Sequence, residues 1–230
     1  MPDAKPLRIA LPDGTAVSGL ALVPPTAKVG LVLAHGAGAG MSHPFMATAA
    51  ERLADRGVAT LRYQFQYMEK GTRRPDPPNV AQVTVRAAVA EAVRQLPDVP
   101  LFAGGKSFGG RMTSEAQAGA ALPCIIGLVF LGFPLHPATR PSAARAQHLV
   151  KVRIPMLFLQ GTRDALAQPD LLAQVIADLG DRATLKSFAD ADHSFHVPKR
   201  SGSTDALVMA KLCDTVSAWV DTVVDAGSPR

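Results

Sequence analysis

Short apolar runs alternate with longer amphipathic segments along most of this chain. The runs cover Val29 to Ala34, Val58 to Leu61, Pro100 to Gly104, Ile125 to Leu131, Pro155 to Leu159 and Ala183 to Ser187. Helical patterns separate most of them, at Phe45 to Arg56, Val80 to Leu96, Phe108 to Ala120, Leu171 to Leu179 and Asp205 to Val224. Buried strands joined by helices are typical of a parallel sheet with helices on both faces.

The start of the chain has a different pattern of apolar and polar residues. Leu7 to Leu11 and Ala16 to Val23 alternate between apolar and polar residues, and Pro12-Asp13-Gly14-Thr15 between them is a turn signal. These segments predict an antiparallel hairpin. We therefore expect an α/β fold with a mostly parallel sheet and an N-terminal antiparallel hairpin, forming a single domain over residues 1–230.

Helix boundaries are predicted at four positions. Asn79 and Thr204 precede helical patterns and suit N-caps, because their side chains can accept a hydrogen bond from the first turn. Gly57 and Gly180 follow helical patterns and suit C-terminal caps.

Composition removes several classes of function. The 24 Lys and Arg residues exceed the 19 Asp and Glu residues by a net charge of +5, but they are scattered and have few aromatic neighbours, so we expect no nucleic-acid partner. No run approaches the ~18 apolar residues that cross a bilayer, and residues 1–6 contain no apolar signal-peptide core. We expect a cytoplasmic protein that does not interact with membranes.

The two cysteines, Cys124 and Cys213, have no metal-site spacing. We expect two buried thiols, with neither a disulfide framework nor a metal site.

A serine motif lies between a predicted strand and a predicted helix. Gly105-Lys106-Ser107-Phe108-Gly109 matches G-x-S-x-G in the strand, turn and helix context of a nucleophile elbow. The same letters contain Gly-Lys-Ser, the end of a phosphate-binding loop. The first glycine of that loop would fall at position 100, where the chain has Pro100, so nucleotide binding is disfavoured.

An acid and a histidine follow Ser107 in the order expected for this architecture. Asp164 leaves the carboxyl end of the strand Pro155 to Leu159, and His193 lies in the loop after the strand Ala183 to Ser187. We interpret Ser107, His193 and Asp164 as nucleophile, general base and orienting acid. Rival histidines are His196 and His136, and rival acids are Asp190 and Asp192, which we interpret as turn formers.

When a serine attacks a carbonyl group, the tetrahedral oxyanion that forms needs two hydrogen-bond donors. The backbone N–H of Phe108, first in its helix, is one candidate. The second is the N–H of Ala37 in the glycine-rich loop His35-Gly36-Ala37-Gly38. We expect His35 to be a structural hydrogen-bonding residue and not a base.

These motifs together resemble the α/β-hydrolase superfamily over nearly the whole chain. The chain is most similar to its small, lidless members related to dienelactone hydrolase, and especially to the group of testis-expressed protein thirty and NSL-complex subunit three. That closer likeness is carried by Tyr67-Met68-Glu69-Lys70-Gly71, Arg74-Pro75-Asp76-Pro77-Pro78, Gly104-Gly105-Lys106-Ser107, Phe133-Pro134-Leu135-His136-Pro137 and Gly161-Thr162-Arg163-Asp164. Dienelactone hydrolase is similar in fold but uses cysteine, so serine here makes the dienelactone reaction doubtful. Serine instead fits ester or thioester hydrolysis.

The expected substrate site is open, because Gly132 to Ile154 has room for one short helix, Ala143 to Val150, and no cap domain. Apolar and aromatic residues are predicted to line it: Tyr67, Met68, Phe133, Leu135 and His136, with Phe108 beside the nucleophile. Three arginines near the rim, Arg73, Arg74 and Arg140, either hold an anionic group or are simply solvated.

The predicted function is hydrolysis of a small-molecule ester or thioester without a metal or organic cofactor. Two alternatives stay open: a binding or scaffold protein that kept the fold, and a peptidase acting on short peptides. The apolar face of the helix Asp205 to Val224 covers the sheet or contributes to a homodimer, and the sequence does not decide between them.

Overall fold

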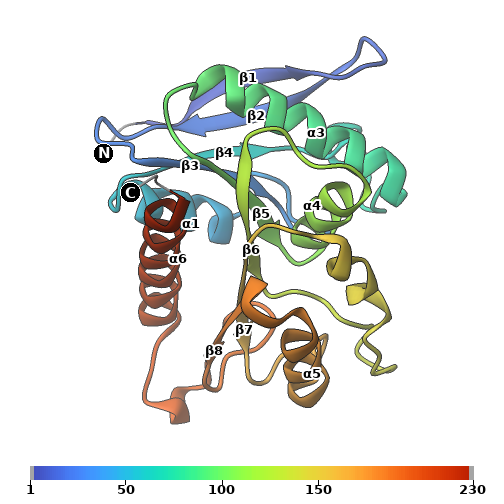
Figure 1. Cartoon of the computed structure of the whole chain (residues 1–230), viewed down its shortest axis with the longest axis vertical. Helices are drawn as coiled ribbons and strands as arrows, with labels where there is room; N and C mark the ends of the chain where they lie inside the picture. Colours follow the sequence, from blue (N-terminus) through green and yellow to red (C-terminus); the bar gives the residue numbers. More distant parts are fainter. Residues whose placement is uncertain (1–2, 228–230) are drawn as a thin grey trace.

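One eight-stranded sheet forms the centre of the molecule (Figure 1), and the computed structural model describes residues 3–227. Residues 1, 2 and 228–230, which the predicted domain includes, lie outside the described residues. The strand order is β1-β2-β4-β3-β5-β6-β7-β8. The strands are β1 (Lys5–Ala10), β2 (Ala16–Leu22), β3 (Val29–Ala34), β4 (Val58–Tyr63), β5 (Leu101–Lys106), β6 (Ile125–Leu131), β7 (Met156–Gly161) and β8 (Ala183–Phe188).

Helices cover both faces of this sheet (Figure 1). Helices α1 (Pro44–Ala54) and α6 (Asp205–Gly227) share one apolar core with the sheet, and α3 (Pro78–Gln95), α4 (Phe108–Gly119) and α5 (Pro169–Leu179) share the other. The remaining elements are the single-turn helix α2 (Gln66–Glu69) and three 3₁₀ helices, η1 (Ala144–Lys151), η2 (Gly180–Arg182) and η3 (Lys199–Ser201). The apolar face of α6 therefore packs on the sheet, as one of the two alternatives expected.

The parallel register brings several loops to one edge of the sheet. Strands β1 and β2 form the predicted antiparallel hairpin, and every pair from β4 and β3 to β7 and β8 is parallel. In register, Ala34 pairs with Gly105, Lys106 with Leu131, and Gly161 with Phe188. The loops that follow β3, β5, β7 and β8 consequently leave the sheet at the same edge.

The predicted α/β architecture is confirmed, including the absence of a cap between β6 and β7. The segment predicted as a short helix at Ala143 to Val150 forms the 3₁₀ helix η1. Thr204 does cap α6, accepting a hydrogen bond from the Leu207 N–H at 3.2 Å. Gly180 is the C-cap of α5, with φ of 59°, as predicted. The C-cap of α1 is Asp55, and Gly57, with φ of 74°, lies in the turn that follows it.

Two local predictions are wrong. Asn79 does not cap α3, because the helix begins one residue earlier at Pro78, whose fixed φ and missing N–H suit the first helical position. Cys124 is exposed, in a turn with φ of 61°, so only Cys213 is a buried thiol.

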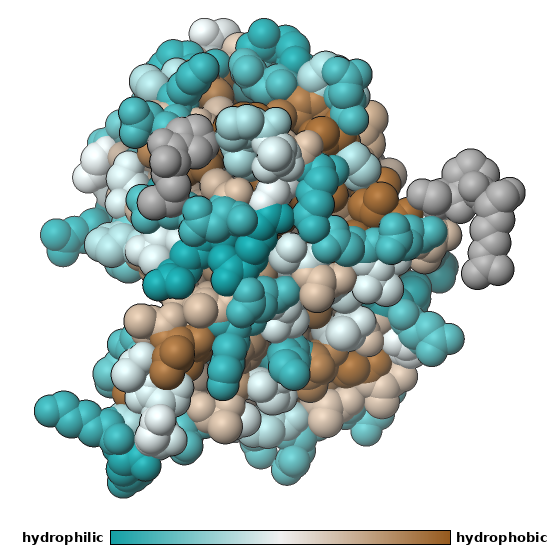
Figure 2. All heavy atoms as spheres, turned by 90° about the vertical axis from the view of Figure 1, so that its left-hand side faces the viewer, coloured by the Kyte–Doolittle hydropathy of each residue, from teal (hydrophilic) through white to brown (hydrophobic). Residues whose placement is uncertain are grey.

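The face of the molecule drawn in Figure 2 offers little contiguous apolar area. Figure 2 shows one face of the molecule, where hydrophobic residues form small separate groups among hydrophilic ones. The large exposed hydrophobic side chains of the described residues come from separate segments: Val23, Val83, Val150 and Leu207. Scattered residues of this kind do not mark an interface, so the homodimer stays a prediction. Between residues 3 and 227, no helix is long and apolar enough to cross a membrane.

The tightest backbone approach in the sheet gives a test of the fold. A Cβ added to Gly104 in β5 would lie 1.8 Å from the carbonyl oxygen of Val129 in β6, so Gly104→Ala forces two central strands apart. We expect a loss of about 3 kcal/mol or more in the free energy of unfolding, measured by urea denaturation.

The matched control is Gly119→Ala at the end of α4, where an added Cβ meets nothing within 4 Å. Alanine favours helix over glycine, so this variant should be as stable as the native chain or slightly more stable. Equal losses in both variants would contradict the packing argument.

Candidate active site

Ser107 occupies a sharp turn between β5 and α4. Its backbone has φ of 50° and ψ of −115°, a conformation that is strained for a residue with a side chain. The neighbouring glycines permit the close packing of this turn. A Cβ added to Gly105 would lie 2.3 Å from the Ala34 carbonyl oxygen, and a Cβ added to Gly109 would lie 2.5 Å from the His35 carbonyl oxygen. Strand, turn and helix thus form the predicted elbow, with the Ser107 hydroxyl at the carboxyl edge of the sheet.

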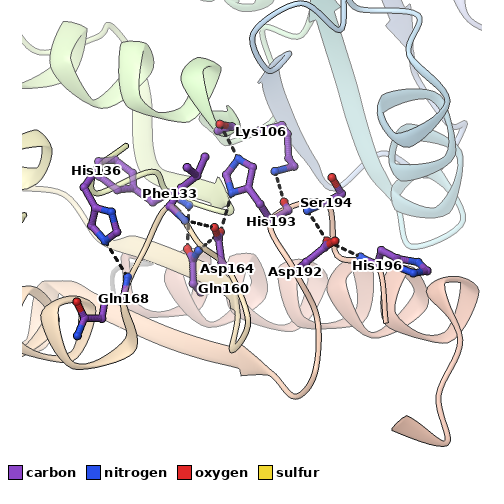
Figure 3. Close-up of polar contacts among 12 residues, drawn as sticks. Lys106, Phe133, His136, Gln160, Asp164, Gln168, Asp192, His193, Ser194 and His196 are labelled. Atoms are coloured by element: carbon purple, nitrogen blue, oxygen red, sulfur yellow. Dashed lines mark hydrogen bonds and ion pairs between the residues drawn. The ribbon is translucent and has the colours of Figure 1, made fainter. Parts of the chain in front are cut away.

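The structure brings Ser107, His193 and Asp164 together. The Ser107 hydroxyl lies 2.8 Å from Nε2 of His193, and Nδ1 of His193 lies 2.6 Å from Oδ2 of Asp164. Figure 3 shows the imidazole of His193 directed at the Asp164 carboxylate. With the proton on Nδ1, His193 donates to Asp164 and accepts from Ser107, which is the arrangement of a general base.

The loops that carry the acid and the histidine pack against each other. An added Cβ at Gly161, the last residue of β7, would lie 2.3 Å from the Ala191 carbonyl oxygen. The Arg163 N–H donates to that same oxygen at 2.9 Å, and the Thr162 N–H donates to the Phe188 carbonyl. These contacts fix the distance between the turn of Asp164 and the loop of His193.

Gln160 holds the Asp164 carboxylate from behind. Its side-chain amide donates to Oδ2 of Asp164, and its carbonyl oxygen accepts the N–H of Phe133 at 2.9 Å (Figure 3). The other carboxylate oxygen of Asp164 accepts the Leu166 N–H at 2.8 Å. The Asp164 side chain is fully buried, and these donors compensate for its loss of water. Nothing in the sequence pattern singled out Gln160.

The two predicted oxyanion donors flank Ser107. Ala37 lines the cleft beside the nucleophile, and Phe108 is the first residue of α4. Within residues 3–227, neither backbone N–H has a hydrogen-bond acceptor, so both are available to a ligand. The loop that carries Ala37 is held by the next residue, since the Gly38 N–H donates to the Tyr67 hydroxyl at 3.0 Å.

His35 is a structural residue, as expected. Its Nδ1 donates to the Gly36 carbonyl at 2.7 Å, and its Nε2 accepts the Phe65 N–H at 3.2 Å. Burial lowers the pKa of His35 to about 4, which keeps the ring in the neutral form that this pair of bonds requires.

The rival residues have other partners. His136 donates to the Pro137 carbonyl and accepts the Gln168 N–H, while His196 lies 2.8 Å from the Asp205 carboxylate. Asp192 accepts the Ser194 and His196 N–H groups (Figure 3), and Asp190 has φ of 58° in its turn. Both acids form the loop that presents His193, as predicted.

An open cleft of about 400 Å³ lies over the nucleophile. Its lining residues are Gly36, Ala37, Ala39, His43, Phe45, Met46, Lys106, Ser107, Leu166, His193 and Ser194. Part of this lining comes from the N-terminal turn of α1, a segment that the sequence presented only as an amphipathic helix.

The predicted pocket residues lie elsewhere. Tyr67, Phe133, Leu135 and His136 are almost fully buried and do not line the cleft, and neither does the partly buried Met68. Their apolar character reflects packing: Tyr67 supports the Ala37 loop, and Phe133 packs edge to face against Phe130 and Phe158 in the core. The rim arginines Arg73, Arg74 and Arg140 are exposed and lie outside the cleft lining.

Comparisons with known proteins agree with this architecture. A family model described as an alpha/beta hydrolase domain matches residues 27–221. Dienelactone hydrolase from Anabaena variabilis superposes with a TM-score of 0.76 at 19% identity, covering 95% of this chain and 96% of that one.

Two further solved structures are similar. An alpha/beta serine hydrolase without a lid from Xanthomonas campestris has a TM-score of 0.73 at 22% identity, covering 94% of this chain and 95% of its own. An alpha-beta serine hydrolase homologue from Coxiella burnetii has a TM-score of 0.70 at 18% identity, covering 92% and 98%. At these identities, the likeness shows the fold.

His35 gives a test of the buried site. In the unfolded chain a histidine binds a proton below a pH of about 6.5, whereas the folded chain protonates His35 only below about 4. Protons therefore favour the unfolded state in this window, and His35 should cost up to about 2 kcal/mol of stability as the pH falls from about 7 to about 5. Urea denaturation at both pH values measures this slope.

His35→Gln should lower stability at neutral pH, since it disturbs two buried hydrogen bonds. It should also reduce the pH dependence, leaving the part that comes from His148, whose pKa burial likewise lowers to about 4. A variant whose slope equals that of the native chain would show that His35 binds its proton in the folded state as readily as in the unfolded state, against the lowered pKa.

Proposed function

Since the chain belongs to the alpha/beta hydrolase domain family, we propose that it is a serine hydrolase that cleaves small carboxylic esters or thioesters through Ser107, His193 and Asp164. The observation that carries the proposal is the continuous chain of hydrogen bonds from the Ser107 hydroxyl through both ring nitrogens of His193 to the Asp164 carboxylate. A hydroxyl is a weak nucleophile unless a base of this kind takes its proton.

The first half of the proposed reaction forms an acyl-enzyme. Oγ of Ser107 attacks the substrate carbonyl carbon while Nε2 of His193 accepts the hydroxyl proton, and Asp164 stabilises the imidazolium that results. The N–H groups of Ala37 and Phe108 donate to the oxyanion of the tetrahedral intermediate. His193 then gives its proton to the departing alcohol or thiol.

The second half returns the enzyme to its starting state. A water molecule attacks the acyl carbon, Nε2 of His193 accepts a proton from that water, and the proton passes to Oγ of Ser107 as the carboxylic acid leaves. The cleft is open and mainly apolar, which suits a small substrate that enters from solution. None of these steps draws on a bound cofactor.

The remaining parts of the proposal are more specific than membership of the family. Closer kinship with the group of testis-expressed protein thirty and NSL-complex subunit three is supported by the sequence phrases that the two share. A cytoplasmic location, a single domain over residues 1–230 and a small-molecule ester as the partner complete the proposed picture.

Labelling by a fluorophosphonate tests the activated serine. The native chain should gain one adduct by intact mass, Ser107→Ala should gain none, and His193→Ala should be labelled about a thousandfold more slowly, because the base is gone. Ser194→Ala is the matched control, since Ser194 also lines the cleft and its loss should leave the adduct in place.

Absence of an adduct on folded native chain would contradict the proposal. Labelling should be accompanied by turnover of short activated esters and thioesters, whereas preferential cleavage of aminoacyl amides would indicate a peptidase instead.

Gln160→Met tests how the acid is held. Removing the donor to the buried Asp164 carboxylate should lower kcat about ten- to a hundredfold, because a hydrogen bond to a charged group contributes about 1.5–3 kcal/mol. KM should change little, since Gln160 does not line the cleft.

The control is Gln117→Met. Gln117 is also buried and accepts the Leu122 N–H at 2.7 Å, but it lies on α4 away from the triad. It should lower the Tm without lowering kcat. A loss of kcat in both variants would mean that reduced stability, and not the position of Asp164, explains the effect.

A further inference from the structure

A lysine side chain forms part of the cleft beside the nucleophile. Lys106 is the last residue of β5 and precedes Ser107, and its side chain lines the cleft. Nζ of Lys106 donates to the His193 backbone carbonyl at 2.6 Å (Figure 3). The same nitrogen lies 6.0 Å from the ring centre of Phe45 and 5.6 Å from that of Phe195.

The position of this ammonium group places it next to the reacting groups. A Cβ built on Gly132 would lie 3.1 Å from Nζ of Lys106 and 3.5 Å from Cε1 of His193, so the two side chains are neighbours. When the carbonyl group of a substrate binds at Ser107, the ammonium group of Lys106 would therefore lie near the bond that is cleaved.

Lys106 has no carboxylate partner among residues 3–227. The nearest acids are engaged elsewhere: Asp164 with His193, Gln160 and the Leu166 N–H, and Asp192 with two backbone N–H groups of its own loop. One backbone carbonyl is the acceptor that the structure gives to an ammonium group with three N–H donors.

Partial burial without a carboxylate partner has a measurable consequence for this group. Desolvation lowers the pKa of Lys106 to about 8, although the charges of Asp164 and Asp192 act in the opposite direction. At neutral pH the amine is still mainly protonated. A partly buried cation without an anionic partner loses part of its hydration, and an anionic ligand in the cleft would offset that loss.

The remaining cleft residues provide no competing charge. Apart from Lys106, the lining contains no Lys, Arg, Asp or Glu, and its other titratable side chains are His43 and His193. The cleft is thus an apolar surface with one cation at its wall. The exposed rim arginines Arg73, Arg74 and Arg140 are not part of it.

We propose that Lys106 makes the cleft selective for esters or thioesters that carry a carboxylate near the scissile carbonyl, with the ammonium group donating to that carboxylate. This inference rests on the proposed hydrolase function and assigns its substrate class. An enzyme without such a cation disfavours the charged ester, because burying a carboxylate unpaired is costly.

The test compares matched esters that differ in charge. One pair places the carboxylate on the acyl side, monoethyl succinate against ethyl pentanoate, and one on the alcohol side, γ-acetoxybutanoate against pentyl acetate. In the native chain, kcat/KM for the charged member of at least one pair should exceed that of the neutral member about tenfold or more. Raising the ionic strength should reduce this ratio, since salt screens the attraction.

Lys106→Met should reduce the charged-to-neutral ratio about ten- to a hundredfold, and Lys106→Arg should retain part of it, since it keeps the charge. Lys186→Met, which removes a cation from the exposed edge of β8, controls for net charge and should leave the ratio unchanged. Fluorophosphonate labelling of each variant reports separately whether the triad is assembled.

Three results would overturn the inference. A native chain that prefers the neutral member of both pairs has no carboxylate subsite. Equal losses on charged and neutral esters in Lys106→Met would make Lys106 a positioning residue for the His193 loop. If fluorophosphonate labels the native chain but charged esters are not preferred, the proposed substrate class alone is refuted. If the native chain is not labelled, the proposed hydrolase function is refuted together with the substrate class.

Discussion

The structure depends on how closely the turn after β5 can approach the end of β3. Gly105 and Gly109 lie against the carbonyl groups of Ala34 and His35, at distances that a side chain would not permit. This contact holds Ser107 in a backbone conformation with φ of 50°, which costs about 1–3 kcal/mol and persists only because the surrounding packing supports it. The hydroxyl is thereby fixed at the edge of the sheet, and the amide of Phe108 is left free at the start of α4.

The same constraint organises the rest of the site. Because β3 and β5 are neighbours in the sheet, the approach that positions Ser107 also places the Ala37 loop beside it, and His35 and Tyr67 hold that loop by buried hydrogen bonds. A glycine plays the same part on the side of the site that carries the acid and the histidine. Gly161 lets the loops after β7 and β8 pack tightly enough for Asp164 to reach His193. Two close contacts between loop pairs thus set the geometry of the whole hydrogen-bonded chain.

The cleft combines a preorganised polar edge with an apolar wall from α1. The carboxylate of Asp164 is buried but satisfied by several donors, whereas the ammonium of Lys106 is partly buried and has one carbonyl acceptor among the residues that the structure describes. Asp164 thus finds its hydrogen-bond partners within the protein, whereas Lys106 can take a partner from a ligand. The cation of the cleft lining is therefore the residue next to the nucleophile, and the rim arginines lie outside that lining.

The sequence by itself determined the alternation of strands and helices, the elbow at Ser107 and the order of acid and histidine, because periodicity, glycine spacing and chain order are local properties. It did not determine the cleft. Tyr67, Phe133 and His136 have the residue types of a pocket, yet they are core or supporting residues. Phe45 and Met46 line the cleft from a segment that the sequence showed only as an amphipathic helix, and Lys106 lines it from the elbow motif, where no pattern marked it as a pocket residue. Gln160 was missed for the same reason, because its amide meets Asp164 only through the turn that closes β7. Which side chains face a cavity depends on the direction of each loop over the sheet edge, and tertiary packing alone sets that direction.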